Sequence, residues 1–316
     1  MPVATASRRK PRQEKPPGAL PLRIWWPYVV GIGGMHLIAL LAFWPWLFSW
    51  TGVASVLIGH HLFGMLGMTV GYHRLLTHRS FQCPRWLEYT LAILGVCCLQ
   101  DTPARWVATH RLHHQHSDQE HDPHSPLVNF MWGQFGWLMV TNRDVMRLSH
   151  LERYAKDLMR DRFYMWLERS HHGLLVFAIH AVLIFGIGAA IGGLTGGWNE
   201  AVRMGFSLLV WGVAVRTVFV WHVTWAVNSL THLWGYQSYS TSDNSRNNWL
   251  VGLLAHGEGW HNNHHALPTA AAHGRKWWEV DLSYRVICLL EMVGLAWNVS
   301  RPEPRREQRL AAESAG

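Results

Sequence analysis

Histidine is concentrated in one short stretch of this chain, THRLHHQHSDQEHDPHS, at residues 109–125. The stretch holds six histidines, although the chain as a whole is 49% hydrophobic and only 15% charged. The spacing HxxHH occurs twice, at residues 110–114 and 261–265. Because side chains three and four residues apart share one face of an α-helix, each box is expected to turn three imidazoles in the same direction. The candidate metal ligands are nine histidines and one asparagine: His73, His78, His110, His113, His114, His232, His261, His264, His265 and Asn228.

The number and type of these ligands indicate a site for two metal ions. Nine histidines are too many for one zinc ion, which takes about four ligands, but they suit two five-coordinate metals. Imidazole binds iron, zinc, copper and nickel, so the ligand type leaves the metal open. The absence of carboxylates from the boxes disfavours magnesium and calcium. Glu258 is the one nearby candidate for a hydrolase base, and it does not form the HExxH motif of zinc peptidases.

Four apolar stretches are long enough to cross a bilayer, which takes about 20 helical residues. Short links join the first stretch to the second and the third to the fourth, which predicts two hairpins. All the histidine groups fall at the ends of these stretches or in the polar segments 71–172 and 228–285. We therefore predict an all-α integral membrane protein with four transmembrane helices in two hairpins and a helical cap that carries the di-metal site. The predicted spans are residues 26–48, 51–70, 173–191 and 204–227.

Basic residues set the predicted orientation. The chain has a formal net charge of +8, and many of the basic residues lie in the first 25. By the positive-inside rule both termini, both polar segments and the metal site lie on the cytoplasmic side, at the plasma membrane if the protein is bacterial. The basic residues are not interleaved with aromatic ones in a stripe, which excludes a nucleic-acid partner. Residues 1–25 are expected to form a disordered tail, residues 26–285 the membrane domain, and residues 286–316 a partly disordered C-terminal segment.

Three further features complete the expected fold. Residues 87–99 form an apolar run too short to span, which predicts a buried or interfacial helix. Residues 148–169 alternate charge with large apolar side chains at helical spacing, which predicts one amphipathic helix. Arg216 lies inside the fourth predicted span and is expected to face the protein interior, because a charge in lipid is costly. The four cysteines form no CxxC pair, so neither a disulfide framework nor a zinc–thiolate site is indicated.

The motifs GYHRLLTHRSF, WVATHRLHHQHSD, DPHSP, WAVNSLTHLWG and GEGWHNNHHALP together resemble those of the membrane fatty acid desaturases, specifically the acyl-CoA Δ9 (stearoyl-CoA) branch. The resemblance extends over about residues 26–284. It implies an oxidoreductase that uses O2 to remove two hydrogens from adjacent methylenes of a long-chain fatty acyl group. It also implies two Fe ions held by the nine histidines, with Asn228 acting through a water. This chemistry suits the ligands, because an unactivated C–H bond has no acid–base handle and requires a metal-based oxidant.

The same resemblance implies a substrate tunnel. It assigns the bend of the acyl chain to Gln100, Trp106 and Thr224, with Trp225 beside them, and the closed end of the tunnel to Met65 and His61. Animal acyl-CoA enzymes of this family carry an Arg–Asp pair just before the second box, where it contacts the CoA headgroup. This chain has Ala108 and Thr109 there, so the acyl carrier is either CoA or a membrane lipid.

Electrons are expected from a separate donor, because the sequence contains neither an HPGG haem motif nor a cysteine pattern for an iron–sulfur cluster. A ferredoxin or a cytochrome b5 with its reductase would serve. Two other functions stay open from the sequence. A related di-iron hydroxylase or alkane monooxygenase would use similar boxes and produce an alcohol. A metal-transport protein would place its histidines along a pathway within the spans.

Overall fold

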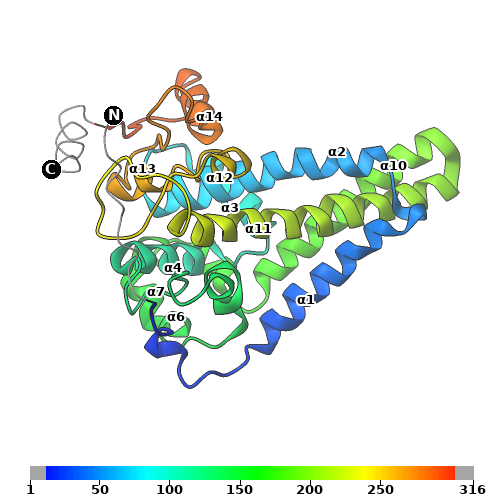
Figure 1. The fold of residues 1–316 in the computed structure, drawn as a ribbon. Helices are drawn as coiled ribbons and strands as arrows, with labels where there is room; N and C mark the ends of the chain where they lie inside the picture. Colours follow the sequence, from blue (N-terminus) through cyan, green and yellow to red (C-terminus); the bar gives the residue numbers. More distant parts are fainter. Residues whose placement is uncertain (1–11, 303–316) are drawn as a thin grey trace.

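The computed structural model describes residues 12–302, and all regular secondary structure in that range is helical apart from isolated β-bridges. Long helices form an elongated bundle, and short helices gather at one end of it, on the left in Figure 1. Apolar side chains cover much of the bundle surface: Leu37 is 68% exposed, Val182 70% and Leu194 90%. Such a surface suits contact with lipid.

Three helical segments are long and apolar enough to cross a membrane, judged by length and composition: Trp26–Phe43, Trp50–Thr77 and His172–His232. The third has 61 residues, and Gly197 interrupts it with a non-helical φ of 72° and ψ of −158°. The chain reverses there, as the returning ribbon at α10 shows (Figure 1). A Cβ atom on Gly188 would lie 2.5 Å from the carbonyl oxygen of Met204, whereas sixteen residues of straight helix span about 24 Å. The link predicted over residues 192–203 is therefore a tight reversal between two helices.

The segment Trp50–Thr77 extends beyond its predicted end at residue 70 and changes its pitch. It begins as α2 (Trp50–Gly59) and continues as the π-helix η4 (His60–Thr77). The amide of His78 bonds to the carbonyl of His73 at 3.1 Å, the i→i+5 bond of a π-helix. Because such a helix has more than four residues per turn, His73 and His78 face the same side.

The amphipathic helix predicted over residues 148–169 is instead three short helices, α7 (Leu148–Tyr154), α8 (Lys156–Met159) and α9 (Arg162–Glu168). The first break is at Ala155, which has non-helical backbone angles and a fully buried side chain. The second is at Asp161, whose carboxylate accepts a hydrogen bond from the amide of Phe163 and so caps α9.

Two further predictions, the short helix at residues 87–99 and the buried Arg216, fit the structure. The apolar run at residues 87–99 forms helix α3 (Arg85–Val96), which buries Leu87 and Leu91. Arg216 is fully buried, as expected, and donates hydrogen bonds to the carbonyl of Cys97 at 2.9 Å and to that of Gly212 at 3.2 Å. These bonds compensate the loss of water around the guanidinium group.

Both predicted terminal boundaries need correction. Residues 12–25 are ordered rather than disordered, since the amide of Gln13 bonds to Leu127 O at 3.0 Å and that of Trp25 to Met139 O at 2.9 Å. The remaining part of the predicted tail, residues 1–11, lies outside the described residues. At the other end, α14 (Leu282–Met292) crosses the predicted boundary at residue 285 and buries Ile287. Residues 303–316 also lie outside the described part.

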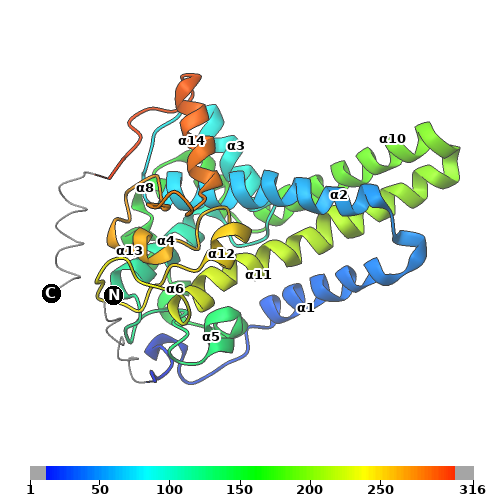
Figure 2. The same ribbon diagram turned by 45° about the horizontal axis from the view of Figure 1, so that its top comes forward.

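The remaining elements connect the bundle and the cap. Short 3-10 helices follow α1 before the chain enters α2, and the π-helix η6 joins α10 to α11. Figure 2 shows α4, α12 and α13 close together at the cap end of the bundle. The bounds of all the elements not yet given are η1 Pro17–Ala19, α1 Trp26–Leu40, η2 Leu41–Phe43, η3 Pro45–Leu47, α4 Pro103–His116, α5 Phe130–Gln134, η5 Gly136–Met139, α6 Arg143–Met146, α10 His172–Leu208, η6 Leu209–Val215, α11 Arg216–Ser229, η7 Leu230–His232, α12 Trp249–Leu254 and α13 His261–Ala266.

The close approach of the two halves of α10 gives a stability test. Gly188→Ala should lower the melting temperature of the purified protein, because the added methyl group meets the backbone of Met204 and Gly205. Overpacking of this kind costs about 1–3 kcal/mol. Gly186→Ala is the matched control, since its Cβ atom would meet nothing within 4 Å. Equal melting temperatures for the two variants would argue against the packing described here.

Candidate metal centre

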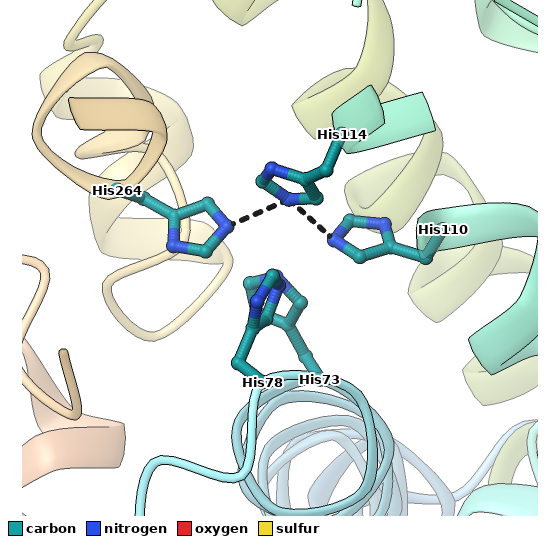
Figure 3. A group of neighbouring side chains, drawn as sticks. All are labelled: His73, His78, His110, His114 and His264. Atoms are coloured by element: carbon teal, nitrogen blue, oxygen red, sulfur yellow. Dashed lines mark hydrogen bonds between the residues drawn. The ribbon is translucent and has the colours of Figure 1, made fainter. Parts of the chain in front are cut away.

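Five histidines from three separate elements form the first cluster. One nitrogen atom of each ring lies within 4.8 Å of the corresponding atoms of the other four. Figure 3 shows the rings converging, with the Nε2 atom of His114 at 3.0 Å from that of His110 and at 3.0 Å from that of His264. The members are His73, His78, His110, His114 and His264, and all except His78 and His114 are buried.

Four further histidines form the second cluster: His113, His232, His261 and His265. The Nε2 atom of His261 lies 3.1 Å from that of His232 and 3.0 Å from that of His265. Stacking of the His114 and His265 rings, with centroids 4.5 Å apart, keeps the two clusters adjacent.

Each HxxHH box contributes to both clusters, so the expectation that three imidazoles point the same way was wrong. His113 and His114 are neighbours on α4, and successive residues of an α-helix are rotated by about 100°. His114 therefore joins His110 in the first cluster, while His113 turns into the second. Likewise α13 gives His264 to the first cluster and the rest of its box to the second. The shared helices explain why two metal sites lie side by side.

Buried carboxylates orient at least three of these rings through hydrogen bonds, and a fourth carboxylate lies beside a histidine of the first cluster. The Nδ1 atom of His232 lies 2.9 Å from Asp118, that of His113 lies 3.0 Å from Asp122, and Asp243 contacts His265 in the same way. In the first cluster Glu258 lies 2.7 Å from the Nδ1 atom of His73. An Nδ1–H group that donates to a carboxylate leaves the lone pair on Nε2, which then points into the cluster.

The converging lone pairs fit a cation. Neutral nitrogens that face one another at 3.0–3.1 Å repel unless a proton or a metal ion lies between them. The Nε2 atom of His113 is buried and has no hydrogen-bond partner among residues 12–302. Carboxylate, histidine and metal in series is the usual arrangement around protein-bound metals. The two histidine clusters are therefore able to bind metal ions.

The protonation states also suit metal binding. Burial, followed by the neighbouring imidazoles, holds the pKa values of His110, His114 and His264 well below the usual range. Burial alone would raise the pKa of Asp122, but the adjacent His113 outweighs it and lowers that pKa. These three imidazoles are therefore neutral and the Asp122 carboxylate is ionised, as metal ligation and its outer hydrogen bonds require.

Two arginines inside the histidine motifs fix the elements that carry them. Arg74 is fully buried, donates to the carbonyl of Ala271 at 2.7 Å and pairs with Glu258 at 3.1 Å, which ties η4 to the segments on both sides of α13. Arg111, on α4, donates to the carbonyl of Leu76 at 2.9 Å and so ties α4 to the end of η4. Sequence reasoning missed both roles.

The asparagines of HNNHH hold α13 in place. Asn262 accepts from the amide of Ser238 at 2.7 Å, and Asn263 donates to the carbonyl of His273 at 2.9 Å. Both are fully buried. Because both asparagines lie between the ligands of the HNNHH box, their hydrogen bonds fix the backbone of that box. Sequence reasoning also missed Asp118, Asp122 and Asp243, although two of them lie in the histidine-rich stretch itself.

A cavity leads from the metal clusters into the helical bundle, and the space in it not filled by protein atoms is about 1100 Å³, part of which is open to solvent. His73, His110 and His261 form part of its wall, and so do all four residues expected at the bend of an acyl chain. Gln100 donates to the hydroxyl of Thr224 at 3.1 Å. Asn228 also lines the cavity and belongs to neither cluster. The four bend residues are Gln100, Trp106, Thr224 and Trp225.

The two residues expected at the closed end of the tunnel lie elsewhere. His61 is exposed and bonds through Nδ1 to the carbonyl of Leu57 at 2.8 Å, and Met65 packs against the hydrophobic core. The cavity wall is made instead by His60, Gly64 and Met68. These positions are four residues apart, so the wide turn of the π-helix places them on one side.

Comparison with known proteins now identifies the family. The fatty acid desaturase family model matches residues 46–287. The chain belongs to the fatty acid desaturase family. It is 42% identical to the sn-1 stearoyl-lipid 9-desaturase of Anabaena variabilis over 90% of this chain and 97% of that protein. It is 41% identical to the sn-2 palmitoyl-lipid 9-desaturase of Nostoc sp. (strain 36), over 89% of this chain and 92% of the relative. An acyl-CoA 5-desaturase of Anemone leveillei is 39% identical over 90% and 82% of the two chains.

Family membership confirms the function predicted from the motifs and decides against a metal transporter. As a desaturase, the protein is an oxidoreductase that acts on fatty acyl groups. The two buried clusters beside a long cavity agree with such a reaction, because they bring metal-binding groups to the wall of a space for an acyl chain.

The carboxylate contacts predict an effect on metal content. Asp118→Asn removes the charge that orients His232, so metal affinity and activity should fall by about 10- to 100-fold. Metal analysis of the purified variant measures this directly. Glu120→Gln is the control, since Glu120 is an exposed acid two residues away. Full metal occupancy in both variants would contradict the role given to Asp118.

The buried histidines also predict how acid affects the metal-free protein. Burial, followed by the charge of Arg74, lowers the pKa of His273 to about 4, whereas the unfolded value is 6.5. Between these values the unfolded chain binds more protons, so stability is present above about pH 6.5 and is lost as the pH falls towards 4. The slope is about 1.4 kcal/mol per pH unit for one such histidine. Between pH 7 and pH 5 the melting temperature of His273→Gln should fall less than that of the wild type. The control His121→Gln, at an exposed site, should match the wild type.

Proposed function

We propose that this protein introduces a Δ9 double bond into an acyl chain of a membrane lipid, at two irons held by its nine clustered histidines. The observation that carries the proposal is the course of the cavity, whose wall includes ligands from both clusters. An acyl chain in this space would pass directly beside both metal sites.

The chain's own residues hold the metals and position the acyl chain. When bound, an iron pair supplies the O2-dependent oxidising power that an unactivated C–H bond needs. The imidazoles supply the nitrogen ligands, and the buried carboxylates balance the charge of bound cations. Asn228 lies in the cavity wall one helical turn before His232, where it can hold a water beside the second cluster.

Selection of one C–C bond is a matter of positioning. The indole of Trp106 stacks on the imidazole of His110, with centroids 4.9 Å apart and planes inclined by 15°. Across the cavity the hydrogen bond between Gln100 and Thr224 joins the start of the cap to α11. A rigid wall beside the metal ligands favours a single position of the acyl chain along the cavity. The residues proposed to contact substrate here are Gln100, Trp106, Thr224 and Trp225.

The acyl carrier proposed is a membrane lipid. The named relatives include both acyl-lipid and acyl-CoA desaturases, so their names alone do not select the carrier. Ala108 is completely buried, and Thr109 contributes to the cavity wall. Neither side chain offers a charge to the phosphates of CoA.

The membrane arrangement proposed has four crossings in two hairpins, with the metal clusters and both termini on the cytoplasmic side. The break at Gly197 supports it, because it divides the 61-residue segment into two antiparallel helices. The basic residues of the N-terminal segment favour the cytoplasm. A separate ferredoxin or cytochrome b5 with its reductase would deliver electrons at this face.

Expression in a host that lacks its own desaturase tests the proposal. Mass spectrometry of the host lipids should show a double bond after carbon 9 of lipid-bound acyl chains. His113→Ala should insert into the membrane but lose metal and double-bond formation, because His113 contributes a ligand to the second cluster. Retained desaturation in this variant would remove His113 from the ligand set, and an alcohol product would identify a hydroxylase.

The carrier requires a separate assay with purified, metal-loaded protein and an electron donor. Stearoyl-CoA and a stearoyl phospholipid in vesicles should be supplied in parallel, and only the phospholipid should be desaturated. Turnover of stearoyl-CoA alone would overturn the carrier proposal and leave the desaturase function intact.

A further inference from the structure

The cavity continues past the metal clusters to a histidine deep in the bundle. His60 lies thirteen residues before the ligand His73 on the same helix and forms part of the cavity wall. It is the eleventh residue of the 28-residue segment Trp50–Thr77, which places it near the middle of a membrane crossing. An ionisable side chain at such a depth indicates a function.

The hydrogen bonds of His60 fix its tautomer. Its Nε2 atom lies 2.8 Å from the carbonyl oxygen of Leu254, which can only accept, so Nε2 carries the proton. The Nδ1 atom is then a hydrogen-bond acceptor. His60 is only 6% exposed, and its Nδ1 atom has no partner among residues 12–302. A buried acceptor requires a donor, so this atom is suited to bind an O–H group in the cavity.

A glycine lies beside this nitrogen. A Cβ atom on Gly64 would lie 3.0 Å from His60 Nδ1 and 3.3 Å from Cγ2 of Val220. Gly64 and Val220 both contribute to the cavity wall. A side chain at position 64 would therefore press against Nδ1. On another side the His256 ring lies at 4.3 Å between centroids and closes the pocket.

We propose that His60, Gly64 and Val220 form a hydroxyl-binding subsite in the acyl cavity, in which His60 Nδ1 accepts a hydrogen bond from an O–H group. The inference rests on the proposed function, because a lipid headgroup stays at the membrane surface and the methyl end of its chain lies near mid-membrane. Two sources have the required chemistry. One is a hydroxyl at the end of the acyl chain, and the other is a bound water that ends the apolar part of the cavity.

The test compares acyl chains in a desaturase-deficient host that takes up stearic, 18-hydroxystearic and icosanoic acids. His60→Leu removes the acceptor, and Gly64→Ser supplies an internal hydroxyl to it. His36→Leu is the matched control, since His36 lies on α1 near His222 and outside the cavity wall. Mass spectrometry then gives the desaturated fraction of each chain relative to stearoyl.

If the hydroxyl comes from the substrate, both cavity variants should lower the relative use of the 18-hydroxy chain by about 3- to 10-fold, the range expected for one neutral hydrogen bond. If it comes from water, His60→Leu should instead raise the relative use of the icosanoyl chain, since the water is lost. Both results support the subsite. Ratios equal to those of His36→Leu for all three chains would overturn it.

A binding measurement separates this inference from the proposed function. The melting temperature of the purified metal-loaded protein is measured with stearate, with 18-hydroxystearate and with icosanoate. In the wild type, 18-hydroxystearate should raise the melting temperature more than stearate does, and this difference should be absent in His60→Leu. That result supports a substrate hydroxyl even if no double bond forms. A larger shift with icosanoate in His60→Leu supports the water. Identical shifts in the wild type and both variants would overturn the subsite, whatever the outcome of the desaturation assay.

Discussion

The structure depends on the pairing of ring nitrogens with buried carboxylates. Nδ1–carboxylate hydrogen bonds direct the Nε2 lone pairs of His113, His232 and His265 into the second cluster. The nine rings of the two adjacent clusters would repel one another without a cation. The carboxylates in turn require buried partners: Asp118 accepts from Ser125 and from the amide of Asn244, and Glu258 pairs with Arg74. The metal clusters therefore lie in a buried polar network, which adjoins the apolar core that Leu91, Leu158 and Ile287 help to form.

The π-helix η4 connects this polar cap to the membrane bundle. Its wide turn allows His73 and His78 to serve one cluster, and it places His60, Gly64 and Met68 on the cavity side of the same helix. In an α-helix the thirteen residues between His60 and His73 make about three and a half turns, so the two side chains would face opposite sides. One change of pitch thus links metal ligation to the shape of the proposed acyl site.

Sequence reasoning succeeded where residue type and local spacing carry the information. The long apolar helices, the buried helix at residues 87–99 and the family itself all follow from patterns of a few residues. It failed where distant groups decide. The helix predicted over residues 148–169 is broken at Ala155, which is buried within the cap. His61 lies on the exposed side of η4, whereas its neighbour His60 lines the cavity.

The sequence by itself determined which side chains are available for metal chemistry and that they flank membrane-length helices, since hydropathy and histidine spacing are local properties. Only the tertiary structure decided how the nine rings divide into two clusters, which carboxylates orient them and which face of η4 meets the cavity. The physical reason is distance along the chain. His73 and His264 are 191 residues apart, and their meeting depends on the pitch of η4, the contacts of Arg74 and Arg111 and the packing of α4 against η4.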